Sequence, residues 1–231
     1  MAQAGIHALV GAALKNVSRS KNGLLIGIIL GNLAPDLDNI AVAIATITGG
    51  STEGLHRTFT HSFITAAAVV LIFYLFRWML KKPEIGNVGL GLGIGIVMHI
   101  LLDLLIWFDG VQVMWPLPSW INLWENVTPP VWWTKLMMPV EFLFMAAFLM
   151  LLIRWGKQAD TDREYLPVAR IIVYALLGLF VVFTVLVYAM GSGFMVPFGA
   201  LYLIALGLMI GVTIRMRRTI SQVEMQEAAG G

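Results

Sequence analysis

The sequence contains no cysteine and little charge. Without cysteine there is no disulfide framework and no thiolate ligand, so a bound metal would have to be held by histidine, aspartate or glutamate. Charged residues make up only 12% of the 231 residues, whereas 59% are hydrophobic and the mean hydropathy is +0.84. A water-soluble domain has nowhere to bury that much apolar surface. The composition therefore predicts an all-α, polytopic helical membrane protein.

The basic residues form no extended patch. The net charge is only +2, and the lysines and arginines lie at the ends of apolar stretches, so we expect no nucleic-acid partner. The chain begins MAQAGIHALVGAALK, with no basic region ahead of its first apolar stretch. We therefore expect no cleaved signal peptide.

Five segments are apolar and long enough to cross a bilayer about 30 Å thick, which takes roughly 20 residues. They are residues 62–80, 88–108, 136–155, 169–190 and 194–214. Three shorter stretches, 6–14, 24–33 and 40–47, are too short to span, so we expect half-helices or a re-entrant hairpin buried by the other helices. One transmembrane domain over residues 1–220 is predicted, with 221–231 as a polar, frayed tail.

Lysine and arginine gather at one end of the predicted helices. The groups are Lys15, Arg19 and Lys21; Arg77, Lys81 and Lys82; Arg154, Lys157, Arg163 and Arg170; and Arg215, Arg217 and Arg218. The positive-inside rule then places this end and the C-terminus on the cytoplasmic side of the cell (inner) membrane. The loop 109–134 at the opposite end has few basic residues and is rich in tryptophan and proline, which predicts a lid on the outer leaflet.

Ionisable residues inside this scaffold are few, and every histidine is among them. The set is His7, Asp36, Asp38, His56, Arg57, His61, His99, Asp103 and Glu141. Such groups are costly within a membrane and mark functional sites by default. His99 and Asp103 are four residues apart, so on a helix both can bind one ion.

Position along the helices predicts that most of this set converges. At about 1.5 Å per residue, five side chains from four segments rise to roughly 20–25 Å above the basic end, and His7 rises to about 12 Å. The five are Asp36, His61, His99, Asp103 and Glu141. We therefore predict a single divalent-metal site near the outer face.

Each of these residues also has a purely structural interpretation. His7 could be a hydrogen-bonded packing residue, and Arg57 could neutralise an aspartate. Asp36 and Asp38 could cap the helix that follows them, and Glu141 could cap its own helix after a proline. The glycines at 89, 91, 93 and 95 indicate close helix packing instead of phosphate binding, because they lie within a spanning helix.

The order of these motifs over residues 1–145 resembles the YdjM-like family of inner-membrane, metal-dependent hydrolases. The motifs are His7; Pro35-Asp36-x-Asp38; His56-Arg57-x-x-Thr60-His61-Ser62; His99-x-x-x-Asp103; and Asp109-Gly110 followed by Trp115-Pro116. That family is in turn similar to the zinc-dependent phospholipase C and single-strand nuclease group. The resemblance implies one zinc or manganese ion on Asp36, His61, His99 and Asp103, and another on His7 with a bridging Asp103.

The same resemblance limits the site. The later His-x-x-x-Glu of the phospholipase C group is absent and only Glu141 stands there, so a full three-metal site is not expected. The helices within residues 165–215 have no acidic residue or histidine in their cores, so we expect them to act as scaffold or as contacts in a homo-oligomer.

A metal at this depth predicts a hydrolase of lipid or lipid-linked phosphoesters, because such headgroups lie at the outer interface. The metal would activate water, Asp38 or Glu141 would accept the proton, and His56 or Arg57 would stabilise the anionic transition state. Two alternatives stay open: an ion- or proton-coupled transporter, and a noncatalytic membrane protein with a structural metal. The nearly bare cytoplasmic halves of the helices and the lack of a repeat favour the hydrolase.

Overall fold

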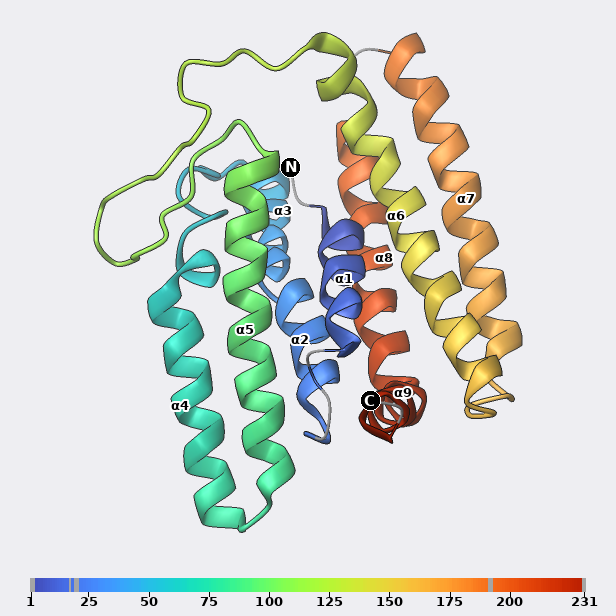
Figure 1. The fold of residues 1–231 in the computed structure, drawn as a ribbon. Coiled ribbons are helices and arrows are strands. Elements are labelled where there is room, and N and C mark those ends of the chain that lie inside the picture. Colours follow the sequence, from blue (N-terminus) through green and yellow to red (C-terminus); the bar gives the residue numbers. More distant parts are fainter. Residues whose placement is uncertain (1–2, 17, 19–20, 191–192, 230–231) are drawn as a thin grey trace.

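The computed structural model describes residues 3–16, 18, 21–190 and 193–229, and in these residues the fold is helical with no β-strand (Figure 1). The five predicted spanning segments are confirmed as long apolar helices. They are α4 (Phe63–Leu80), α5 (Pro83–Ile106), α6 (Val131–Gln158), α7 (Leu166–Ala189) and α8 (Met195–Arg215). Their starts follow local chemistry: the Ser62 side chain accepts from the Ile64 N–H to cap α4, and α5 and α7 carry proline in their first turn.

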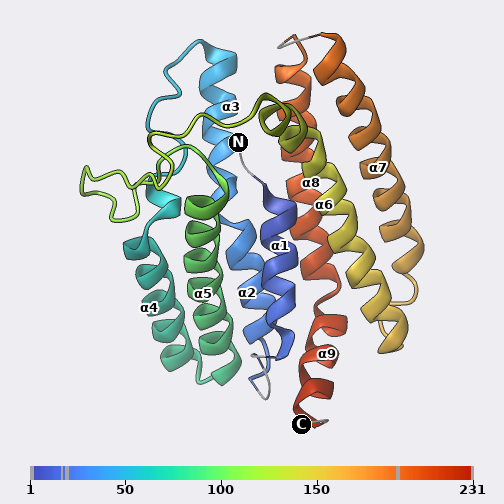
Figure 2. The ribbon, with the colours of Figure 1, turned by 45° about the horizontal axis from the view of Figure 1, so that its top comes forward.

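A sixth segment of spanning length corrects the prediction that the early stretches are too short. The helix α2 (Leu24–Leu33), the 3-10 turn η2 (Pro35–Asp38) and the helix α3 (Asn39–Thr48) follow one another from one end of the bundle to the other (Figure 2). Pro35 lacks a backbone donor and interrupts the α-helical ladder, but the tighter 3-10 turn carries the chain onward. The charged Asp36 and Asp38 therefore lie in the middle of an apolar segment.

The N-terminal helix α1 (Ala4–Ala13) stays short, as predicted, and is followed by the 3-10 turn η1 (Leu14–Asn16). It begins partway along the bundle and packs between α2 and α6. Ala4, Ala8 and Ala12 are fully buried or nearly so, because small side chains allow close contact with both neighbours. This depth brings His7 to the level of α5's upper half.

Glycine sets the distance between the helices that carry the site. Gly27 and Gly31 of α2 face Gly91 and Gly95 of α5, and a Cβ at any of these positions would collide with the backbone of the opposite helix. The glycines at 89 and 93 lie against the side chains of Phe73 and Val70 of α4, and a Cβ at either position would collide with them. The predicted role in close helix packing is confirmed. This close packing of α2 on α5 brings η2, which follows α2, near the end of α5 that carries His99.

Aromatic packing dominates the other half of the bundle. Phe142 of α6 stacks on Phe183 of α7 at 5.6 Å between ring centroids and meets Phe198 of α8 edge-on at 5.5 Å. All three rings are buried, and such contacts add to the burial energy of large apolar side chains. The outward face of α7, in contrast, exposes large apolar side chains such as Ile171 and Val185, as a lipid-facing helix does.

The C-terminal segment corrects a second prediction. Most of the expected frayed tail belongs to a helix, α9 (Arg217–Ala229), which packs against α2, α6 and η1. Ile220 and Val223 are buried on its inner face, and the Glu224 carboxylate accepts hydrogen bonds at 3.0 Å from the N–H groups of Gly23 and Leu25. Glu224 therefore caps the start of α2, which a count of polar residues in the tail does not indicate.

Candidate metal centre

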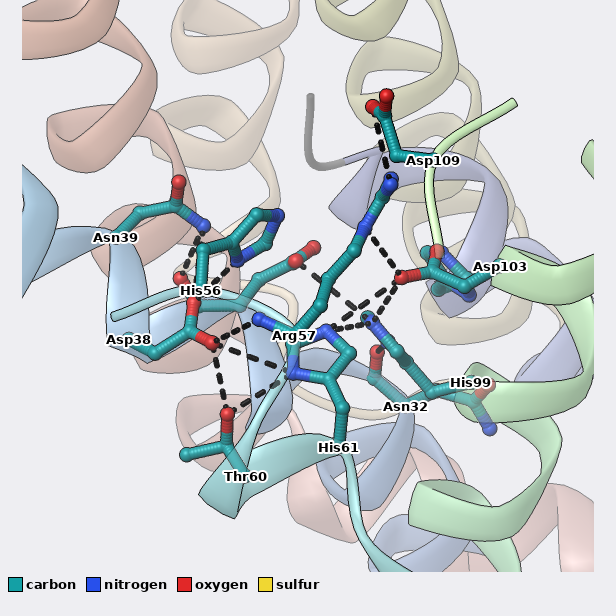
Figure 3. Close-up of polar contacts among 12 residues, drawn as sticks. Asn32, Asp38, Asn39, His56, Arg57, Thr60, His61, His99, Asp103 and Asp109 are labelled. Carbon is teal, nitrogen blue, oxygen red and sulfur yellow. Dashed lines mark hydrogen bonds and ion pairs between the residues drawn. The ribbon is translucent and has the colours of Figure 1, made fainter. Parts of the chain in front are cut away.

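Of the five residues predicted to converge, all but Glu141 lie close together, joined by His7, Asp38 and His56 (Figure 3). The set thus contains four histidines and three aspartates. They come from α1, η2, the loop before α4, the 3-10 turn η3 (Phe59–His61) and α5. They form three groups whose ligand atoms lie within 4.8 Å of one another: His7, His99 and Asp103; Asp36, His61 and His99; and Asp38, His56 and His61. His61 and His99 each belong to two groups, so we call the whole set the His/Asp cluster.

The backbone of α2 fixes the orientation of His99. Its Nδ1 lies 2.7 Å from the carbonyl oxygen of Asn32. A carbonyl only accepts hydrogen bonds, so this nitrogen carries a proton and donates it. In the neutral ring Nε2 is then a bare lone pair directed into the cluster, as in many metal-binding histidines.

A carboxylate does the same for His61. Its Nδ1 lies 3.2 Å from Asp38 Oδ2 and 2.9 Å from Thr60 Oγ1, while the Thr60 hydroxyl donates to that carboxylate at 2.8 Å. Because Thr60 Oγ1 gives its own proton to Asp38, both neighbours of Nδ1 act as acceptors; Nδ1 therefore carries the ring proton, and Nε2 is left with a lone pair. Burial lowers the pKa of His61 despite the nearby carboxylates, which favours the neutral ring.

The two nitrogens that carry these lone pairs lie close together, since His61 Nε2 is 3.1 Å from His99 Nε2. Two bare nitrogen acceptors repel at this distance unless a positive charge lies between them. Donors on one tetrahedral zinc ion, with bonds of about 2.0–2.1 Å, are roughly 3.3 Å apart. The observed separation of the two nitrogens therefore fits a shared metal ion.

Two buried carboxylates lie near these nitrogens, each in its own group with His99. Asp103 Oδ2 lies 3.5 Å from His61 Nε2 and 3.8 Å from His99 Nε2, and Asp36 Oδ1 lies 3.7 Å from His99 Nε2. Both Asp36 oxygens are buried without a hydrogen-bond partner among the described residues. Two imidazole nitrogens and two carboxylates are a donor set that suits zinc or manganese.

His7 joins the cluster from α1 by packing against the ring of His99. Its ring stacks on His99 at 3.7 Å between centroids, and its Nε2 is 3.2 Å from Asp103 Oδ1. The sequence predicted a lower position for His7 along the helices, but the structure brings its ring into the His/Asp cluster. Asp103 thus meets His7 with one oxygen and His61 with the other, which is the geometry a bridging carboxylate needs.

Asp38 binds residues that flank the central donors. Its Oδ1 lies 2.7 Å from His56 Nδ1, and its Oδ2 accepts from the Arg57 N–H at 3.2 Å and from Thr60. A carboxylate that orients a ligating histidine commonly has such a network. This position suits an orienting role for Asp38, and its predicted role as proton acceptor stays a prediction.

Glu141 lies apart from the three groups. Its Oε1 accepts from the Gly5 N–H at 2.8 Å, so it caps α1 and not its own helix. Its Oε2 is buried without a hydrogen-bond partner among the described residues. The prediction that Glu141 accepts a proton in catalysis stays a prediction.

Arg57 pairs with one of the buried aspartates, as the structural interpretation anticipated. Its Nε is 3.3 Å from Asp103 Oδ2, and its guanidinium lies over the Trp107 ring at 5.6 Å. The His/Asp cluster holds three carboxylates, and of these the guanidinium pairs with Asp103, while Asp38 accepts from the Arg57 backbone N–H. One guanidinium cannot balance three ionised carboxylates, and a divalent cation would supply the missing positive charge.

The orienting roles of three residues were not predicted from the sequence, although Thr60 and Asp109 belong to the motifs that carry the family resemblance. Asn32 holds His99 through its carbonyl, Thr60 bridges His61 and Asp38, and Asp109 pairs with Arg57. A signal existed for Asn32, a polar residue four positions before Asp36 in an apolar run. Its contribution comes from the backbone, however, and side-chain type does not predict that.

Comparison with known proteins agrees with the architecture. Residues 2–192 match the family described as YdjM inner membrane protein. No curated protein and no solved structure matches the chain. The matched range contains the whole His/Asp cluster and ends before α8. Since the match covers most of a chain with six helices long and apolar enough to span, this multi-pass membrane protein belongs to the YdjM inner membrane protein family.

Proposed function

We propose that the chain is a membrane-embedded, metal-dependent hydrolase that acts on a phosphoester of a lipid or lipid-linked substrate. The observation that carries the proposal is the pair of Nε2 atoms of His61 and His99, 3.1 Å apart, with both Nδ1 atoms committed to acceptors. A purely structural histidine pair would share a proton through a donor and an acceptor. This pair instead presents two acceptors beside two buried carboxylates.

The proposal assigns the primary ion to His61, His99, Asp36 and Asp103. His99 Nε2 has one lone pair, so the two groups that contain His99 cannot both use it for separate ions. A second ion would have to rely on His7 and the other oxygen of Asp103. When bound, zinc or manganese would supply Lewis acidity and lower the pKa of a coordinated water.

The chain's own residues would supply positioning and charge. Asp38 and Thr60 orient His61, and the Asn32 carbonyl orients His99, so that both lone pairs stay aimed at one point. Arg57 would bind the anionic group of the substrate beside the ion. Glu141, which has one unpartnered oxygen among the described residues, is our candidate for the proton acceptor.

The lipid substrate follows from the surroundings of the cluster. The loop between α5 and α6 exposes Trp115 and Trp120, and the first turn of α6 exposes Trp132; tryptophan prefers the headgroup region. The exposed apolar surface of α4 begins immediately after η3 and would face lipid tails. We place this end toward the outer face because the basic residues gather at the other end.

Elemental analysis of detergent-purified protein tests the metal. We expect stoichiometric zinc or manganese in the wild type and its loss in His99→Ala and Asp103→Ala, with Asp160→Asn in a distant exposed loop as control. Hydrolysis of phosphatidate and other lipid phosphoesters is then measured with the metal present and chelated. A metal-free wild type, purified without chelators, would contradict the proposal and favour transport. Metal without turnover of any phosphoester would favour a structural ion.

A further inference from the structure

We infer that Asp109 is a built-in occupant of the phosphate subsite: its carboxylate holds the place on Arg57 that a phosphate group of the ligand takes. The inference deepens the proposed function and rests on it for the identity of the substrate. Its evidence is separate, because it comes from the contrast between a fixed arginine and an exposed aspartate. The shared ligand chemistry is a phosphate group, either in a lipid headgroup or as a free anion.

The arginine is held on all sides. Its backbone is left-handed, with φ 61°, a conformation that a bulky residue adopts only when its surroundings enforce it. The Arg57 N–H donates to Asp38 Oδ2 at 3.2 Å, and its carbonyl accepts from the Gln112 N–H at 2.9 Å. The side chain is 3% exposed and lies over Trp107. A guanidinium fixed in this way loses little entropy when it binds an anion.

Asp109, in contrast, is exposed and is not held by its surroundings. Asp109 lies in the loop after α5, its side chain is 73% exposed, and its Oδ2 is 3.2 Å from Arg57 Nη1. Because the Asp109 carboxylate keeps most of its contact with water, the pair is weakened toward the strength of a surface ion pair, so a competing anion would lose only about fivefold in affinity by displacing it. The loop backbone need not move, because Val111 pairs with Ile121 and the Val113 carbonyl accepts from the Phe63 N–H. Rotation of the Asp109 side chain is sufficient.

The location suits a substrate phosphate. Asp103 Oδ2 lies between Arg57 Nε at 3.3 Å and His61 Nε2 at 3.5 Å, so the guanidinium is directly beside the His/Asp cluster. Figure 3 shows Arg57 extending from the cluster toward Asp109, with Asp103 at its side. An anion at Nη1 would therefore stand where the buried cluster meets the exposed loop. A planar guanidinium also matches phosphate better than an ammonium does.

Binding of inorganic phosphate to the detergent-purified full chain tests the inference. Asp109→Asn removes the competing charge and should tighten phosphate binding three- to tenfold at low salt, with the gain shrinking as salt rises. Glu125→Gln is the matched control, since it removes the same charge from an exposed position in the same loop, and it should change the affinity less than twofold. Arg57→Lys should weaken binding at least tenfold, and the helical circular-dichroism signal verifies that it folds.

Two results would overturn the inference. One is an Asp109→Asn affinity no tighter than that of Glu125→Gln, and the other is unchanged binding in a folded Arg57→Lys. Elemental analysis of the same samples keeps the proposed function separate. A metal-free protein with the Asp109 effect intact would lose the hydrolase but keep the subsite, whereas a metal-loaded protein without the effect would do the reverse.

A second arm identifies the source of the phosphate. The protein is placed in nanodiscs of phosphatidylcholine with or without phosphatidate, and inorganic phosphate binding is measured again. Displacement of phosphate by phosphatidate would assign the subsite to a lipid headgroup. Undiminished binding would assign it to a free phosphate anion. Both results support the subsite, and they differ only in its ligand.

Discussion

The two halves of the bundle both bury aliphatic side chains but differ in the other residues that they bury. The half that contains α1, α2, η3 and α5 buries histidines and aspartates between helices separated only by glycine and alanine. The half formed by α6, α7 and α8 buries phenylalanine and aliphatic side chains. Polar burial is costly and small residues provide little apolar surface. The comparison indicates that the aromatic half supplies stability and that the glycine half supplies geometry.

Removing a scaffold aromatic should have the largest effect. Phe142→Ala deletes a fully buried ring in contact with Phe183 and Phe198, and we expect it to cost about 3–5 kcal/mol of unfolding free energy. Thermal melting in detergent, followed by circular dichroism, measures the loss. Metal content per folded molecule should stay at the wild-type level. Selective loss of metal would break the division between the two halves.

Adding a single methyl group to the glycine half should have the next effect. Gly31→Ala places a Cβ against the backbone at Leu92, so α2 and α5 must separate, at about 1–3 kcal/mol. The same substitution at Gly178 of α7 meets nothing within 4 Å and should be neutral or stabilise by up to about 1 kcal/mol, because alanine favours helix. Because α2 leads into η2 and α5 carries His99, Gly31→Ala should also lower metal content. Equal behaviour of the two variants would refute a geometric role for these glycines.

A substitution beside the proposed ligands should change metal affinity with little change in the stability of the fold. Thr60→Val keeps the shape of the side chain but removes the hydroxyl that joins His61 to Asp38. Loss of such an outer partner typically weakens metal binding 10- to 100-fold. Competition with a chelator of known affinity measures the change. The matched control is Thr134→Val, an exposed threonine in the first turn of α6, which should leave the affinity at the wild-type value.

The sequence predicts most of the architecture and the membership of the cluster, for a physical reason. Long apolar runs and the cost of burying charge act residue by residue, so the five spans and the convergence of His99 with Asp103 can be inferred locally. Continuity through Pro35 could not, because it depends on a 3-10 turn that tertiary packing supports. Nor could the different tasks of Asp36 and Asp38. Only the fold reveals that Asp36 has no hydrogen-bond partner for its carboxylate among the described residues and that Asp38 orients His61.

The smallest effect concerns the cap that α9 places on α2. Burial raises the pKa of Glu224 even though its oxygens accept from backbone N–H groups. A raised pKa means that the folded protein holds this proton more tightly than the unfolded chain. Stability from this group is therefore fully present below the usual glutamate pKa near 4.5 and is lost as the pH rises through the raised value.

Comparing Glu224→Gln with the wild type isolates the pH-dependent stability that Glu224 contributes, because glutamine carries no titrating proton. The melting temperature of the wild type relative to this variant should fall between pH 4.5 and pH 7, by roughly 2–4 °C at most, about 1 kcal/mol for a chain of this size. Glu164→Gln, an exposed acid at the same end of the bundle, should show no such trend. A relative melting temperature that instead rises with pH would mean that the positive end of α2 outweighs burial. The C-terminal helix would then stabilise the glycine half through charge, and not only through the packing of Ile220 and Val223.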